Sequence, residues 1–105
     1  MIGLNFVSLS GNLGGTVTEG KTTDGTEALA FDVVCQSLPG DLSKPTRVWT
    51  RVNVYDPALL ARIRPRLKRG VYVQIHGELM NRRGQNTELL EIRATQIITM
   101  ERPSE

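Results

Sequence analysis

The stretch from residue 47 to residue 55 constrains the fold most, because its residues alternate in kind. Its even positions carry the β-branched residues Val48, Thr50, Val52 and Val54. Its odd positions carry Arg47, Trp49, Arg51, Asn53 and Tyr55. A period of two places alternate side chains on opposite faces of a strand, so one face is predicted to be buried and the other exposed. The chain is therefore predicted to contain a sheet with one solvent-facing side.

Two further strands are predicted before this stretch. The first covers residues 4–13, and residues 16–18 continue it after a bulge at a glycine cluster. A turn at residues 19–26 separates it from an alternating second strand at residues 29–35. Residues 38–46 contain two prolines and a glycine, which predicts a loop.

A short helix is predicted after the alternating stretch. Asp56 followed by Pro57 is the arrangement of a helix N-cap with proline at the first helical position. Residues 58–63 supply an apolar stripe that would face the core. Pro65 is expected to end or kink the helix, because proline cannot donate the next backbone hydrogen bond.

Strands at residues 71–80 and 87–100, joined by a hairpin loop at 81–86, are predicted to complete the chain. The element order is then three strands, one short helix and two strands. This is the order of an all-β, five-stranded OB-fold barrel with one short helix between strands 3 and 4. At 105 residues the chain has room for one domain, predicted to span residues 1–100, with a short frayed C-terminus at 101–105.

Apolar stretches and cysteine content bear on the cellular compartment. No stretch approaches the roughly 20 apolar residues that cross a bilayer, and the first residues lack the pattern of a secretion signal. Cys35 is the only cysteine, so no intramolecular disulfide can form. A cytoplasmic protein without a membrane partner is therefore expected.

The charge of the chain is unevenly distributed. The formal net charge is only +2, yet residues 47–69 carry seven basic side chains against the single carboxylate of Asp56. A basic centre favours a polyanionic partner. The alternative is a solvated charged surface that keeps the protein in solution.

Motifs for catalysis, cofactors and metals fail on residue type or spacing. Residues 11–15 contain three glycines but lack the Gly-Lys-Ser/Thr ending of a phosphate-binding loop. His76 is the only histidine and cannot lead a histidine-rich metal cluster, so it is expected to be exposed or at an interface. Cys35 is in phase with the core residues of its strand. No enzyme, no cofactor and no metal site are predicted.

The exposed face of the alternating stretch is the candidate binding site. Its two aromatic side chains offer flat π surfaces for bases, and its arginines offer cations for phosphates. Two more arginines extend this basic path at the tip of the last hairpin loop. The candidate residues are Arg47, Trp49, Arg51, Tyr55, Arg82 and Arg83. The alternative is that both aromatic rings fill a subunit interface while the arginines are merely solvated.

Five segments carry motifs in a fixed order along the chain. Residues 5–14 are Asn-Phe-Val-Ser-Leu-Ser-Gly-Asn-Leu-Gly, residues 31–34 are Phe-Asp-Val-Val, and residues 48–52 are Val-Trp-Thr-Arg-Val. Residues 69–79 begin with Arg-Gly and end with Ile-His-Gly-Glu-Leu, and residues 91–94 are Glu-Ile-Arg-Ala. Together these segments resemble the bacterial and mitochondrial single-stranded DNA-binding protein family.

The resemblance implies an OB fold that binds single-stranded DNA without sequence preference and protects it in replication, recombination or repair. RNA stays open as a second ligand. The family implies a nucleoid-associated homo-oligomer, a tetramer or a dimer, whose subunits pair through the first strand, here residues 4–10. Trp49 falls where the family has a base-stacking tryptophan, and Tyr55 falls where it often has a phenylalanine.

The sequence also departs from the family. Two other tryptophan positions of the family fall in regions that hold Leu38-Pro39 and Gly84 here, which predicts weaker stacking. Thr50 replaces a frequent interface histidine. The glycine-rich tail with an acidic tip is missing, so protein recruitment through such a tail is not expected. Two alternatives stay open: an accessory subunit of a replication-restart complex, and an OB module that binds protein.

Overall fold

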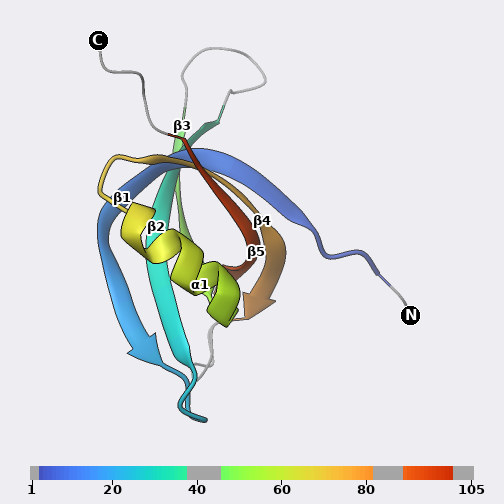
Figure 1. The fold of residues 1–105 in the computed structure, drawn as a ribbon. Coiled ribbons are helices and arrows are strands. Elements are labelled where there is room, and N and C mark those ends of the chain that lie inside the picture. The colour runs from blue at the N-terminus through green and yellow to red at the C-terminus, as the bar shows by residue number, and fades with distance from the viewer. Residues whose placement is uncertain (1–2, 38–45, 82–88, 101–105) are drawn as a thin grey trace.

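The described residues, 3–37, 46–81 and 89–100 of a computed structural model, form a closed barrel of five strands (Figure 1). The strands are β1 (Val7–Lys21), β2 (Glu27–Ser37), β3 (Thr46–Val54), β4 (Tyr72–Asn81) and β5 (Leu90–Met100). Between β3 and β4 lie the helix α1 (Pro57–Ile63) and the 3-10 turn η1 (Arg64–Arg66). The predicted all-β barrel with one short helix between its third and fourth strands is confirmed.

The first strand closes the barrel by pairing with two neighbours. The strand order is β1-β2-β3-β5-β4, and every pair is antiparallel except β3 with β5. The first half of β1, up to Asn12, pairs with β4, and the second half pairs with β2. The register with β2 shifts between Gly14 and Thr18, which confirms the bulge predicted at the glycine cluster.

The helix packs against the barrel through the apolar stripe predicted from the sequence. Leu59, Leu60 and Ile63 are buried and join the core of the barrel. The Asp56 carboxylate accepts a hydrogen bond from the backbone N of Leu59 at 3.1 Å, so it is the N-cap that the sequence predicts. η1 begins directly before Pro65, where an α-helix cannot continue. No helix of the described part is long and apolar enough to cross a membrane.

The boundaries of the first turn differ from the prediction. The turn was predicted to begin at residue 19, but β1 continues to Lys21. The turn begins later because the side chains that close it belong to Thr22 and Asp24. The backbone N of Thr26 donates to Thr22 Oγ1 at 3.2 Å and to Asp24 Oδ1 at 3.1 Å. Gly25 has a φ of +87°, a conformation that favours glycine. Most of the two loops expected at 38–46 and 81–86 lies outside the described residues.

The burial of β3 does not alternate as predicted, because its first four residues are exposed and its last three are buried. Val52 and Val54 are fully buried, and Trp49 is 61% exposed. Asn53 was expected on the exposed face, yet it is buried because β5 pairs alongside it. Val48 is exposed because, among the described strands, only β2 pairs with β3 at that position. The alternation therefore predicts the facing of Trp49 correctly and misses the side chains whose environment depends on β5.

Candidate nucleic-acid interface

Trp49 presents an exposed aromatic ring that packs on a fixed support. Its backbone on β3 is in register with Val34 of β2. A Cβ atom added at Gly14 of β1 would come within 2.7 Å of Trp49 Cζ3 and within 2.8 Å of Val34 Cγ2. The ring therefore packs against bare backbone at Gly14. Since 61% of Trp49 is still exposed, a planar ligand can stack on the remaining surface.

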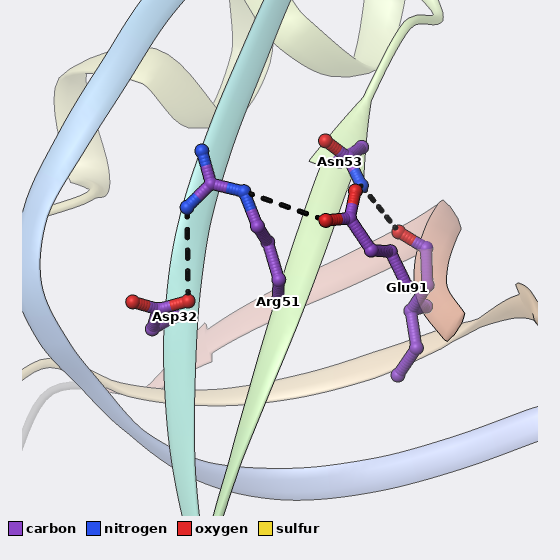
Figure 2. A network of polar contacts seen from close by, with 5 residues as sticks. Asp32, Arg51, Asn53 and Glu91 are labelled. Atoms are coloured by element: carbon purple, nitrogen blue, oxygen red, sulfur yellow. Dashed lines mark hydrogen bonds and ion pairs between the residues drawn. The ribbon is translucent and has the colours of Figure 1, made fainter. Parts of the chain in front are cut away.

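The two arginines that flank Trp49 differ in their partners. Arg47 is exposed, and its side chain has no ion pair within the described residues. Arg51 lies between two carboxylates, with nitrogen–oxygen distances of 3.8 Å to Asp32 and 3.8 Å to Glu91 (Figure 2). The charge of Arg51 is therefore already compensated by the protein, whereas the charge of Arg47 faces solvent.

A polar network ties the face of β3 to β2 and β5. Asn53 Nδ2 donates to Glu91 Oε1 at 2.9 Å, and Glu91 in turn faces Arg51 (Figure 2). The Glu91 side chain is only 11% exposed, so its charge needs these partners. The network joins three strands and holds the surface beside Trp49 in one arrangement.

Tyr55 follows β3 at the opposite end from Arg47 and borders a cavity of about 710 Å³. The cavity also touches the β1–β2 turn, Met80 and Arg93. Arg93 forms an ion pair with Glu78, which lines the same cavity. This volume lies within the usual range of ligand pockets, about 300–1,000 Å³, and Tyr55 supplies an aromatic wall. The cavity can therefore accept a base beside Tyr55.

The sequence of this barrel matches the model of a known protein family. The sequence model of the single-strand binding protein family matches residues 4–101, which is most of the chain. The chain belongs to the single-strand binding protein family. Among curated proteins, no sequence matches this chain significantly.

Solved structures of single-strand binding proteins share this fold. A Plasmodium falciparum SSB in complex with ssDNA has a TM-score of 0.81 and 21% identity, covering 96% of this chain and 98% of that chain. The mitochondrial single-stranded DNA binding protein Rim1 of S. cerevisiae has a TM-score of 0.78 and 16% identity, covering 98% of this chain and 100% of that chain. At such identities the likeness shows that the fold is shared.

The residues predicted for the site do not all lie together. Arg47, Trp49 and Arg51 share one face of β3, whereas Tyr55 lies about 20 Å along the chain from Trp49, at roughly 3.3 Å per residue. The predicted residues that the structure describes are therefore spread along β3, and Tyr55 stands apart at the cavity. Arg82 and Arg83 lie outside the described residues.

Neither His76 nor Cys35 belongs to a metal-binding cluster within the described residues. His76 is half-buried on β4, with its Nε2 3.4 Å from Gln74 Nε2 and its ring centroid 5.8 Å from that of Phe6. Cys35 packs against the core, and burial raises the pKa of its thiol. A raised pKa keeps the thiol protonated and unreactive near neutral pH.

Two residues of this surface were not predicted from the sequence. Gly14 belongs to the glycine cluster that predicts the bulge, and in the structure it also makes room for the Trp49 ring. Glu91 was not singled out, although a carboxylate beside Ile92 in an apolar strand indicates a buried, partnered charge. The sequence signal that could have pointed to Gly14 is the Gly-Asn-Leu-Gly motif at residues 11–14. Gly14 follows Asn12 by two residues, so the two residues lie on the same face of the strand.

Proposed function

We propose that this protein binds single-stranded DNA without sequence preference and protects it in replication, recombination or repair. Bases stack on Trp49 and beside Tyr55. The exposed ring of Trp49, packed on Gly14, is the observation that carries the proposal. Every base has a π face, so stacking on a protein aromatic ring tolerates any sequence. The proposed function is binding alone, with no covalent step.

The arginines of the site have different parts in this proposal. Arg47 lies beside Trp49 without an ion pair among the residues that the structure describes, and it is the cation expected to contact a phosphate there. Arg51 forms ion pairs with Asp32 and Glu91, which hold its side chain in place on β3. Because these carboxylates already compensate its charge, Arg51 is expected to contribute less than Arg47 to phosphate binding. Arg82 and Arg83 are proposed to contact phosphates from the segment that joins β4 to β5.

We also propose a cytoplasmic homo-oligomer, a tetramer or a dimer, formed by pairing residues 4–10 between chains. Within the described residues, β1 pairs only with β4 before Asn12, so its other edge has no strand beside it. An unpaired edge is a template for pairing with a second chain. Leu4 and Phe6 precede β1 directly and are 93% and 62% exposed, which supports a contact between chains there.

Trp49 provides a direct test, because it is the only tryptophan and its fluorescence reports on one site. Titration with dT oligomers is expected to quench this fluorescence. Trp49→Ala is expected to weaken binding of labelled dT, followed by anisotropy, by roughly 5- to 150-fold, since stacking one base is worth about 1–3 kcal/mol. Trp49→Phe, which keeps an aromatic ring, is expected to retain most of the affinity.

Two results would count against the proposal. The first is unchanged dT affinity in Trp49→Ala together with no quenching of the wild-type protein at saturation. The second is a lower oligomer mass of Trp49→Ala at unchanged affinity, which would place the ring in a subunit interface instead.

A further inference from the structure

A second basic surface lies on the chain from the last residue of η1 to the start of β4, apart from the arginines of β3. We define it as the basic turn, formed by Arg66, Lys68 and Arg69. The three residues line a cavity of about 470 Å³ together with Tyr72 and Met100. All three are exposed, and within the described residues none of their side chains forms an ion pair or a hydrogen bond. Uncompensated cations around one cavity attract an anion.

Two neighbouring arginines, in contrast, bind partners within the protein. Arg64 pairs with Glu19 at 2.8 Å and with Glu27 at 3.5 Å. Arg62 donates from Nη2 to the backbone O of Ile97 at 3.0 Å. Arg62 and Arg64 therefore stabilise the fold, whereas the cations of the basic turn have no such partner in the part of the chain that the structure describes.

One row of residues connects Trp49 to the basic turn. Trp49 is in register with Val34 of β2, and Val34 is in register with Asn12 of β1. Asn12 Nδ2 donates to the backbone O of Gly70 at 3.0 Å, directly after the basic turn. Neighbouring strands lie about 4.8 Å apart, so Asn12 is about 10 Å from Trp49 across the barrel. No side chain in this row is charged.

We propose that single-stranded DNA stacked on Trp49 continues across β2 and β1 and is held by phosphate contacts to the basic turn. This inference rests on the proposed function and adds the direction of the strand. At the roughly 3.4 Å per nucleotide of a stacked strand, the row spans about three nucleotides. This span is shorter than the roughly 4–16 nucleotides that one OB fold covers, so one bound oligomer can reach from Trp49 to the basic turn.

The test compares the salt dependence of dT12 affinity between the wild-type protein and Arg66→Gln/Lys68→Gln/Arg69→Gln. Each phosphate contact on a single strand contributes about 0.7 to the slope of log affinity against log salt. If all three side chains contact phosphates, the magnitude of the slope is expected to be smaller by up to about 2 in the triple variant. Saturating dT12 should still quench the fluorescence of Trp49 in this variant. A thermal melt of each variant checks that the barrel is folded.

The matched control separates a phosphate contact from a change in net charge. Arg69→Gln and Arg64→Gln each remove one positive charge, but among the described residues only Arg64 has carboxylate partners. Arg69→Gln is expected to lower the slope by about 0.7 and Arg64→Gln to leave it nearly unchanged. Equal losses in the two variants, or an unchanged slope in the triple variant, would overturn this path and assign the basic turn to another anionic partner. Absence of Trp49 quenching in the wild-type protein would overturn the proposed function as well.

Discussion

Among single residues, Gly14 determines where the Trp49 ring can lie. The Cβ of Gly14→Ala would be 2.7 Å from Trp49 Cζ3, closer than real contacts of this kind. The ring is therefore expected to move from its support and to stack less well. We expect Gly14→Ala to shift the fluorescence emission of Trp49 and to weaken the affinity for dT oligomers. The loss of affinity should not exceed that of Trp49→Ala, which is roughly 5- to 150-fold.

A control and a double-mutant cycle distinguish positioning of the ring from general damage to β1. Gly3→Ala, just before β1, is the control, because a Cβ at Gly3 meets nothing within 4 Å and Gly3 lines neither cavity. It is expected to change neither emission nor affinity. In a Trp49→Ala background, Gly14→Ala should have no further effect on affinity. Additive losses in the double variant would show that Gly14 acts independently of Trp49.

Among elements, the β1–β2 turn has a built-in dependence on pH. Hydrogen bonds from Thr22 and Thr26 lower the pKa of Asp24 from 3.8 to about 2. A carboxyl group with a lowered pKa in the folded state stabilises that state above its unfolded pKa and loses the effect as pH falls. The contribution of Asp24 is therefore fully present above about pH 4 and lost as pH falls through about 2.

This dependence predicts a difference between the wild-type protein and Asp24→Asn, whose amide does not titrate. The thermal midpoint of the wild-type protein is expected to fall more steeply than that of Asp24→Asn between pH 4 and pH 2. All other carboxylates titrate in both proteins, so the difference isolates Asp24. Parallel curves over this range would contradict the prediction.

The elements themselves could be predicted from the sequence, but their mutual contacts could not. Local chemistry was sufficient for the N-cap at Asp56, the end of α1 before Pro65 and the facing of Trp49. The burial of Asn53 and the role of Gly14 depend on strands that are distant in sequence and adjacent only in the barrel. Register between strands is set by the closed barrel, so period-two alternation within one strand could not reveal these contacts.

In the molecule as a whole, β1 links the two surfaces proposed here. Its centre supports the Trp49 ring at Gly14, and its first half has an edge that no described strand covers. Pairing of two chains along this edge would bring two Trp49 surfaces into one particle. A longer single strand could then contact both barrels, which raises its affinity through the effective concentration of the second site.

The oligomer predicted from this edge can be tested with charges placed on exposed positions. Leu4 and Phe6 are 93% and 62% exposed, so Leu4→Lys/Phe6→Lys is expected to cost the folded chain little, while lysines on an edge oppose pairing. Light scattering should give the wild-type protein a mass that is a multiple of 11.6 kDa and shift the variant towards 11.6 kDa. Leu90→Lys, at a position 57% exposed on β5, is the control and should keep the wild-type mass. A wild-type monomer at micromolar concentration would rule out pairing through β1.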